Sequence, residues 1–229
     1  MTCLGGSKFP FHQGCALLLS TLLLVGSFAF SGSGVCAQEV AATAEQRSLE
    51  SIFHACTVCH GTREMQRGPI LDGLEAWYLA AQLRKFRAGL RGQNPENRSE
   101  FLMGSAIDLI GNEQEIKALA VHISHLPRPR FVPIIQGDVA QGRQLYAQHC
   151  AACHGSSGEG RPSLKAPRLI GLEDWYVLNQ LRKFQNGQRA WHADDLEGQT
   201  MANCVRDLVP PHFRDIMVGL NQMERASTR

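Results

Sequence analysis

Two copies of the pattern Cys-x-x-Cys-His are the residues of this chain with the clearest chemical meaning. They are Cys56, Cys59 and His60 in the first copy, and Cys150, Cys153 and His154 in the second. Two thiols one helical turn apart can each add across a vinyl group of the same haem, and the next histidine then lies beneath the iron as its proximal ligand. We therefore expect two covalently bound haem c groups, with these four cysteines as attachment points and both histidines as axial iron ligands.

Paired cysteines also serve other chemistries, which the sequence allows us to weigh. A zinc site could be built from both pairs, but zinc does not explain a histidine directly after each pair. A thioredoxin-like redox pair lies at the start of a helix in a βαβ unit, and no strand pattern surrounds either motif. Chance does not readily produce two such motifs in one duplicated chain.

The duplication is visible in long matches at a constant spacing. The segment 73–79 recurs 98 positions later at 171–177, and the five residues 82–86 recur unchanged at 180–184. The two motifs are only 94 positions apart, so the second copy has four extra residues in the stretch 155–160, which is rich in Gly and Ser. That composition is typical of a surface loop that tolerates insertions.

One methionine in each copy is placed to be the second axial ligand. Met103 and Met201 are 98 positions apart and follow their histidines by 43 and 47 residues, in what we expect to be loops. The other methionines after the N-terminal segment have no partner at this spacing: Met65, Met217 and Met223. A methionine is often a core filler, but this recurrence favours iron ligation. A thioether ligand raises the reduction potential relative to a second histidine and fills the last iron position.

Pro69 and Pro167 also match at a spacing of 98. A proline near the proximal histidine can offer its carbonyl oxygen to the ring N–H and so fix the tautomer, or it can be a plain loop breaker. Two residues of the second copy stay outside this scheme. We expect His192 to be a solvated loop residue, and Cys204 to be a small buried hydrophobic one.

The elements that must position these side chains are helical. Apolar residues recur at helical spacing through 74–86, 116–123 and 213–220, and no alternating strand pattern appears. Gly89 is expected to end a helix whose last turn is basic. Basic residues near such helix ends could neutralise haem propionates, dock an acidic partner or simply be solvated. There are six of them: Arg84, Lys85, Arg91, Arg182, Lys183 and Arg189. Each all-α copy is small for a self-sufficient core, and a buried haem would supply apolar interior.

The N-terminal segment has the pattern of a signal peptide. An apolar run over 16–30 follows Lys8, and Val35 and Ala37 satisfy the small-residue rule for cleavage. The run is shorter than the roughly 20 residues of a membrane-spanning helix, although an uncleaved anchor remains the alternative. We expect a signal peptide over 1–37, a first domain over 38–128, an extended proline-rich linker over 129–136, a second domain over 137–229, and a periplasmic location.

Composition narrows the function further. Without residues 1–37 the chain has 22 basic and 21 acidic residues, so no excess positive charge points to a nucleic-acid partner. Five cysteines remain, and an odd number does not fit a simple disulfide framework.

Both Cys-x-x-Cys-His motifs, the Gly-Pro or Ala-Pro loop, the Trp-Tyr helix and the two late methionines resemble dihaem class I cytochromes c of the cytochrome c4 type. The resemblance implies two tandem class I cytochrome c-like domains, each wrapped around a haem with His/Met ligation. It also implies periplasmic electron carriage between partners such as a quinol-oxidising complex and a terminal oxidase, often with peripheral membrane association. The second copy departs from the pattern at 191–195 and around Cys204.

These expectations favour an electron shuttle that is not an enzyme. The alternative is a cytochrome subunit of a membrane oxidase or dehydrogenase complex. A dihaem peroxidase would need an iron with an open position, and neither copy lacks its methionine.

Overall fold

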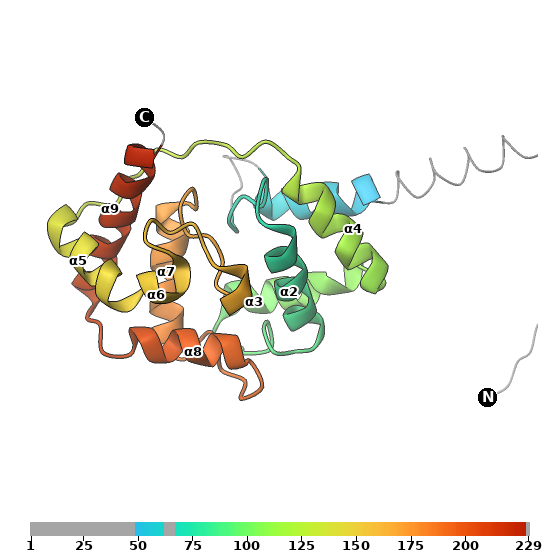
Figure 1. Ribbon diagram of the computed structural model, residues 1–229. Helices are drawn as coiled ribbons and strands as arrows, with labels where there is room; N and C mark the ends of the chain where they lie inside the picture. The colour runs from blue at the N-terminus through green and yellow to red at the C-terminus, as the bar shows by residue number, and fades with distance from the viewer. Residues whose placement is uncertain (1–48, 62–66, 228–229) are drawn as a thin grey trace, which may run out of the picture. The chain divides into compact units, whose positions relative to one another are not determined.

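The computed structural model describes residues 49–61 and 67–227, with side chains as far as residue 223. The expected signal peptide over 1–37 and Met65 lie outside the described residues. Within the described ranges every regular element is a helix (Figure 1), apart from one isolated bridge between Arg161 and Ala166. The all-α prediction is confirmed.

The helices fall into two series that repeat one another. We call residues 49–126 the first half and residues 139–227 the second half. The first half contains a helix over 49–60, α2 (Ala76–Arg87), α3 (Arg98–Ala106), the 3-10 turn η1 (Ile107–Leu109) and α4 (Glu113–Ser124). The second half contains α5 (Val139–His149), α6 (Ala151–His154), η2 (Pro162–Leu164), α7 (Asp174–Gln185), α8 (Leu196–Val205) and α9 (Pro210–Ser227). Both α2 and α7, and α3 and α8, begin 98 residues apart, so the duplication extends to the helices.

The middle helix of each half ends where the sequence predicts. A glycine in the left-handed region follows each helix, Gly89 after α2 with φ 72° and Gly187 after α7 with φ 74°. Only glycine adopts this conformation without a steric penalty, so it ends the helix at low cost. The basic residues of the last turn also stabilise the helix, because their positive charges interact favourably with the negative end of the helix dipole.

Each half has its own hydrophobic core. In the first half, Ile116, Leu119 and Ile123 of α4 are almost completely buried against α2. In the second half, Phe213 and Leu220 of α9 are likewise almost completely buried in the core, as the apolar stripe at 213–220 predicts.

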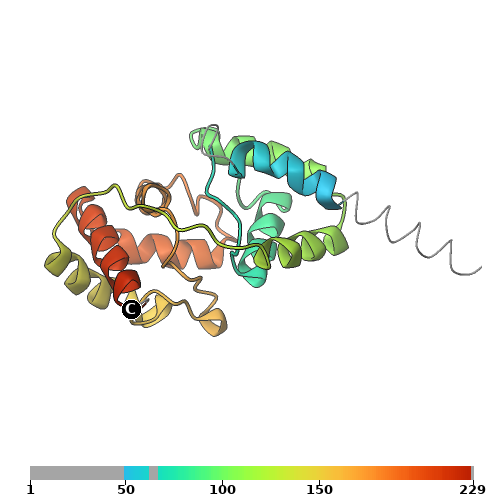
Figure 2. The same cartoon turned by 90° about the horizontal axis from the view of Figure 1, so that it is seen from above.

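Helices α5 and α9 pack closely against each other, as Figures 1 and 2 both show. A Cβ atom on Gly142 of α5 would lie 1.8 Å from the backbone oxygen of Asp215 in α9, and a Cβ on Gly219 would lie 2.8 Å from the backbone of Arg143. Glycines at both positions let the two backbones approach. This contact fixes the helix that leads into the second Cys-x-x-Cys-His motif.

The segment 127–138 has no regular secondary structure and connects the two halves (Figure 2). It is fastened to the start of α7, because the carboxylate of Asp174 accepts hydrogen bonds from the backbone N–H groups of Ile134 and Ile135 at 2.6 and 2.8 Å. Nε of Arg128 donates to the carbonyl oxygen of Gly171 at 2.8 Å. The proline-rich segment is therefore irregular but held in place.

The prediction that both late methionines lie in loops is wrong. Met103 lies within α3 and Met201 within α8. For α8 the reason is the cap: the Asp195 side chain accepts a hydrogen bond from the backbone N–H of Gly198 at 3.1 Å and so starts a helix before Met201.

The prediction of a free surface loop at 155–160 is also wrong in part. Gly155 and Gly158 are buried, and the carbonyl oxygen of Gly158 accepts hydrogen bonds from the N–H groups of Leu169 and Ile170 at 2.7 and 3.2 Å. The N–H of Gly160 donates to the carbonyl oxygen of His154 at 2.8 Å. The four extra residues thus belong to a loop that packs against the motif histidine's own segment.

Among the described helices, none combines the length and the apolar character needed to cross a membrane.

Candidate haem sites

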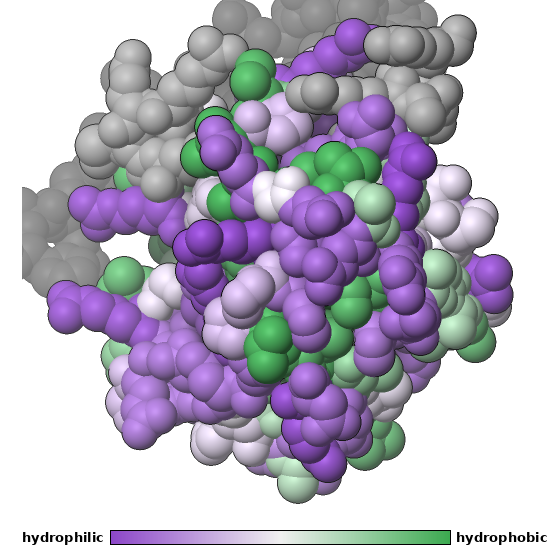
Figure 3. Space-filling model, turned by 90° about the vertical axis from the view of Figure 1, so that its left-hand side faces the viewer, coloured by the Kyte–Doolittle hydropathy of each residue, from purple (hydrophilic) through white to green (hydrophobic). Residues whose placement is uncertain are grey.

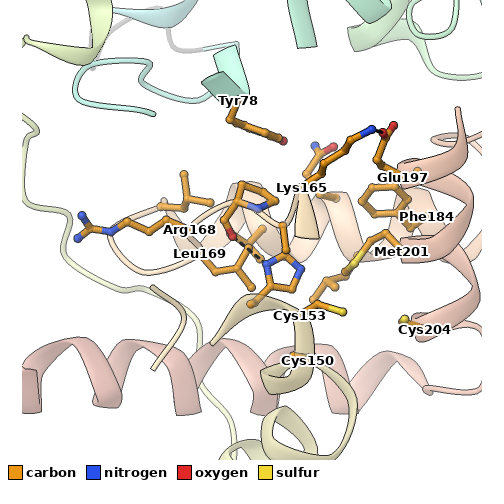
Figure 4. A pocket seen from close by; sticks show the side chains of 18 of the residues that line it. Tyr78, Cys150, Cys153, Lys165, Arg168, Leu169, Phe184, Glu197, Met201 and Cys204 are labelled. Carbon is orange, nitrogen blue, oxygen red and sulfur yellow. Dashed lines mark hydrogen bonds and ion pairs between the residues drawn. The ribbon is translucent and has the colours of Figure 1, made fainter. Parts of the chain in front are cut away.

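A cavity of about 380 Å³ lies beside the second Cys-x-x-Cys-His motif. Its wall brings together four of the predicted residues: Cys150, Cys153, His154 and Met201 (Figure 4). Val177, Leu181 and Phe184 of α7 and Leu220 of α9 add apolar surface to the same wall. The cavity has the size and the mainly apolar lining of a cofactor site.

The two motifs are held by different backbone geometry. In the first half, Cys56, Cys59 and His60 lie in one continuous helix over 49–60. In the second half, α5 ends at His149, Cys150 has a non-helical φ of −120°, and the short α6 carries Cys153 and His154. Both arrangements keep the cysteines about one helical turn apart on the same side of the chain.

The first cysteine of each motif does not have the lowered pKa of a reactive thiol. Burial raises the pKa of Cys56, and it raises the pKa of Cys150 to about 12. Both thiols are therefore protonated at neutral pH, whereas a thioredoxin-like pair depends on a lowered pKa. Among the described residues, no three His, Cys, Asp or Glu side chains gather into a site for a bare metal ion, so the zinc hypothesis has no support from the structure.

Each motif histidine is hydrogen-bonded to the matching proline. Nδ1 of His60 lies 2.7 Å from the carbonyl oxygen of Pro69, and Nδ1 of His154 lies 2.8 Å from that of Pro167. A carbonyl oxygen can only accept, so Nδ1 carries the proton and Nε2 is left with its lone pair. Burial also lowers the pKa of both histidines. Each ring is thus neutral at pH 7 and presents the nitrogen that can bind a metal.

The approach of the proline loop to the first histidine depends on a glycine. A Cβ atom on Gly68 would lie 2.4 Å from Cε1 of His60, closer than any side chain can come. The second half has Ala166 at the equivalent position, 6% exposed, so the two loops reach their histidines with slightly different packing.

In each half, the methionine lies in a different helix from the Cys-x-x-Cys-His motif. Met201 of α8 reaches towards the cavity that His154 also lines (Figure 4). Met103 of α3 packs, together with Cys56, against the core of the first half. The two helices that carry each proposed ligand pair thus belong to one packed unit in each half.

Several residues of the second site were not found from the sequence. Tyr78, Gln82 and Lys85 of the first half line the cavity of the second half. Nζ of Lys85 forms ion pairs with Asp195 and, at 2.8 Å, with Glu197. No local pattern relates residues about 110 positions apart, so only the departure at 191–195 pointed to this region.

Glu197 links two cations at the edge of the cavity. Its carboxylate accepts from Lys165 at 2.6 Å as well as from Lys85, and these two hydrogen bonds lower the pKa of Glu197 to about 2. The chain of ion pairs joins Lys165, directly after η2, to α8 and α2. Lys165 and Glu197 are labelled in Figure 4.

The basic residues, Cys204 and His192, which the sequence analysis also considered, differ in their exposure to solvent. Arg84 is exposed and pairs with Glu113 at 2.5 Å, whereas Arg91, Lys183 and Arg189 are buried. Cys204 is exposed, which corrects the expectation of a buried hydrophobic residue; it lies in α8 among the residues that line the cavity. His192 does not line the cavity; its ring packs against Trp191.

Comparison with known proteins follows the same division into halves. A family model described as "Cytochrome c" matches residues 50–127, and a model described as "Cytochrome C oxidase, cbb3-type, subunit III" matches residues 137–206. The thiosulfate dehydrogenase electron acceptor of Stutzerimonas stutzeri is 30% identical over 167 residues, which cover 67% of this chain and 73% of that protein. Cytochrome c4 of Azotobacter vinelandii is 27% identical over 204 residues, covering 83% and 90% of the two chains.

The chain is a dihaem class I cytochrome c of the cytochrome c4 type. The solved structure of cytochrome c4 from Acidithiobacillus ferrooxidans agrees, with a TM-score of 0.57, 25% identity, and coverage of 72% of this chain and 96% of that one. As a member of this family, the chain carries two covalently bound haem c groups and transfers electrons.

The residues of this cytochrome fit that cofactor. In the second half, two thiols, a neutral imidazole with a bare Nε2 and a thioether line one mainly apolar cavity. In the first half, the indole N–H of Trp77 is buried and has no acceptor among the described residues, whereas its counterpart in Trp175 donates to Glu173 at 3.0 Å. A buried donor of this kind would be satisfied by an acceptor on a bound cofactor.

Proposed function

We propose that this cytochrome is a periplasmic electron shuttle with one His/Met-ligated haem in each half. In the first half Cys56 and Cys59 would attach the haem, with His60 and Met103 as axial ligands; in the second half the corresponding residues are Cys150, Cys153, His154 and Met201. The observation that carries the proposal is the cavity in which the last four side chains meet.

The chain's own residues prepare the iron sites. Haem iron, which changes between Fe(II) and Fe(III), supplies the electron transfer when bound. Pro69 and Pro167 would orient the histidines through the hydrogen bonds at 2.7 and 2.8 Å, which fix the tautomer and the ring plane. The apolar walls exclude water, and a low local dielectric raises the reduction potential.

A methionine at the second axial position would leave no open site on either iron. A peroxidase needs such a site, so the proposal is of a carrier and not of an enzyme. Electrons would then enter and leave through the haem edges without a bound substrate.

The ligands can be tested by optical spectroscopy of the ferric holoprotein, using the weak absorption band of methionine-to-iron charge transfer. Met103→Ala and Met201→Ala should each remove about half of the band. Met217→Leu is a matched control, because Met217 is 1% exposed in the core of the second half and should leave the band intact. A band unchanged in Met201→Ala would show that the second haem has another ligand.

The N-terminal segment and the domain limits are part of the same proposal. We place a cleaved signal peptide at 1–37, a first domain at 38–128, a linker at 129–136 and a second domain at 137–229. The irregular segment 127–138 between the two helical series supports the division. Mass spectrometry of the protein from a periplasmic extract should give a mature chain that starts at Gln38; a chain that retains 1–37 in the membrane fraction would favour the anchor.

The comparisons support redox partners at both ends of the transfer. One relative is named as the electron acceptor of a thiosulfate dehydrogenase, and the second half matches a family described as an oxidase subunit. The shuttle would therefore accept electrons from a dehydrogenase or a quinol-oxidising complex and pass them to a terminal oxidase, with peripheral membrane association. On the face shown in Figure 3, hydrophilic side chains surround smaller apolar areas, as is usual for a surface in contact with water.

A second candidate function is that of a cytochrome subunit in a membrane oxidase or dehydrogenase complex, which the match of residues 137–206 to an oxidase subunit favours. Cell fractionation followed by gel filtration separates the two. A protein that elutes alone after a salt wash supports the shuttle, and one that co-elutes with a membrane enzyme through purification supports the subunit.

A further inference from the structure

One arginine of the segment that connects the two halves is hydrogen-bonded to both of them. Nε of Arg128 lies 2.8 Å from the carbonyl oxygen of Gly171, and its Nη1 lies 3.4 Å from the carbonyl oxygen of Gly73. The two glycines are 98 residues apart, so they occupy the same position of the duplicated unit. A side chain that donates to equivalent atoms of two related units lies close to the two-fold axis between them.

Packing against the first half fixes the base of this side chain. A Cβ atom on Gly73 would lie 2.9 Å from Cβ of Arg128 and 3.1 Å from the carbonyl oxygen of Leu126, so the connecting segment runs directly against the turn at Gly73. The N–H of Gly73 donates to the carbonyl oxygen of Ile123 at 3.0 Å, which attaches the turn to α4. Arg128 is therefore anchored in the first half while its Nε reaches the second.

Both carbonyl oxygens lie just before the middle helix of their half. Gly73 precedes the first residue of α2 by three positions, and Gly171 precedes the first residue of α7 by three. Helix α7 forms part of the wall of the second cavity, and α2 belongs to the core against which Cys56 and Met103 pack. The two hydrogen bonds thus link the elements that flank the two candidate haem sites.

The other contacts between the halves are mostly polar. Among the labelled helices, every closely packed pair lies within one half. Nζ of Lys183 donates to the hydroxyl of Ser99 at 2.6 Å, and the side chain of Asn97 donates to the carbonyl oxygen of Gln188 at 3.1 Å. Leu172 is the apolar residue that packs against both cores. Contacts of this kind allow two domains to move relative to each other unless another group restrains them.

We propose that Arg128 is a positioning residue, which holds the starts of α2 and α7 together and so fixes the placement of the two halves for electron transfer between their haems. A guanidinium suits this role, because its N–H groups point in fixed directions from one planar group and can reach two carbonyl oxygens at once. The part that concerns electron transfer rests on the proposed function, whereas the restraint on the two halves does not.

The first test is amide hydrogen exchange of the reduced holoprotein, followed residue by residue by NMR. Two backbone N–H groups report directly on the contact between the halves: that of Ile70 donates to Glu173 at 2.8 Å, and that of Arg168 donates to Glu75 at 3.0 Å. In Arg128→Gln both should exchange about tenfold faster, because the contact opens more often when its restraint is lost.

The same spectra contain the controls. The N–H groups in the middle of α4 and α9 should keep their exchange rates in Arg128→Gln, because these helices pack within their own halves. Arg130→Gln is the matched control, since Arg130 is an exposed arginine of the same segment and should leave Ile70 and Arg168 protected.

A third variant separates geometry from charge. Arg128 also lines the second cavity, where a cation could act on a bound haem through its charge alone. Arg128→Lys keeps that charge but replaces the planar fork by a single ammonium on a flexible stem. It should therefore behave like Arg128→Gln and not like the wild type.

The second measurement concerns electron transfer itself. In a half-reduced sample, NMR exchange spectroscopy of the haem methyl resonances gives the rate at which the two haems exchange an electron. Arg128→Gln and Arg128→Lys should both slow this rate by about tenfold, since the two sites are no longer held in one geometry. The haem content and the methionine band should stay as in the wild type.

The proposal is overturned if Ile70 and Arg168 keep their wild-type exchange rates in Arg128→Gln, or if Arg128→Lys preserves the protection and the electron exchange. Faster amide exchange with an unchanged rate of electron exchange would overturn the role in electron transfer. Failure of the proposed function would be seen separately, as a wild type that lacks two haems or lacks the methionine band.

Discussion

Glu75 and Glu173 occupy equivalent positions at the starts of α2 and α7, and each carboxylate reaches into the other half of the molecule. Glu75 accepts the backbone N–H of Arg168 at 3.0 Å, and Glu173 accepts that of Ile70 at 2.8 Å. The two donors are themselves 98 residues apart. Contacts that are exchanged in this way are typical of a two-fold symmetric dimer, and the duplicated chain has kept them within one polypeptide.

The charged side chains around the same contact are not exchanged in this way. Lys85 pairs with Asp195 in the second half, but its equivalent Lys183 donates to the hydroxyl of Ser99 in the first half at 2.6 Å. The buried arginines Arg91 and Arg189 differ in a similar way. Arg91 pairs with Glu100, whereas the position equivalent to Glu100 in the second half is Gly198. The duplication has therefore preserved the backbone contacts between the halves while the charges beside each haem site have diverged.

The largest effect should come from the cores, which form separate clusters in the two halves. Phe213 is completely buried in the second core, so Phe213→Ala should lower the free energy of unfolding by about 3–5 kcal/mol. Denaturant titration followed by circular dichroism measures the cost. Phe101→Ala is the control, because Phe101 is 44% exposed. Equal costs for the two substitutions would contradict the core assignment.

The next effect tests the ion pair that only the first half contains. Burial alone would raise the pKa of Glu100, but the surrounding cations, Arg91 first and then Arg189 and Lys183, outweigh burial and hold this pKa below the ordinary 4.5. The stabilisation is then complete above pH 4.5 and is lost as the pH falls through the lowered pKa. Breaking a buried pair costs about 3 kcal/mol, so Glu100→Gln should be less stable than the wild type by about that amount at pH 7.

The difference between wild type and Glu100→Gln should shrink as the pH is lowered in a series of denaturant titrations. A difference that stays constant down to pH 3 would mean that the carboxylate charge of Glu100 does not contribute to folding. Glu113→Gln serves as a comparison, because the exposed pair with Arg84 should contribute little at any pH.

The smallest expected effect on stability concerns the two contacts that Glu75 and Glu173 make with the opposite half. Glu173 also accepts the indole N–H of Trp175 at 3.0 Å and is 5% exposed, whereas Glu75 is less buried. Glu173→Ala should therefore cost about 1–3 kcal/mol and Glu75→Ala about 0.5–1.5 kcal/mol. Thermal unfolding of the two variants side by side gives the ranking, and the reverse order would contradict it.

Much of this architecture could be predicted from the sequence because it depends on local patterns. The helical stripes at 116–123 and 213–220 and the glycine after α2 determine helices that the structure confirms. The helices that hold Met103 and Met201 were missed, since the cap at Asp195 is a hydrogen bond and not a periodic pattern. Burial of the loop at 155–160 was missed for a similar reason: polar and glycine-rich composition does not reveal backbone hydrogen bonds to residues 169 and 170.

The residues of the candidate site could be predicted from the sequence, but the charged side chains that surround them could not. The two motifs and the spacing of 98 indicate the haem and iron ligands we propose. The pairing of Lys85 with Asp195 and the hydrogen bond from Arg189 to Tyr78 depend on contacts between distant parts of the chain. The substitution of Glu100 by Gly198 is visible when the two copies are aligned, but its importance depends on the burial of the arginines.

The most direct test of a two-haem carrier is the number of electrons that each chain accepts, measured by reductive titration together with the haem content. The wild type should contain two haems and take up two electrons. Cys56→Ala with Cys59→Ala, and Cys150→Ala with Cys153→Ala, should each contain one haem and take up one electron. A motif variant that still binds two haems, or a wild type that takes up only one electron, would contradict the assignment of one haem to each half.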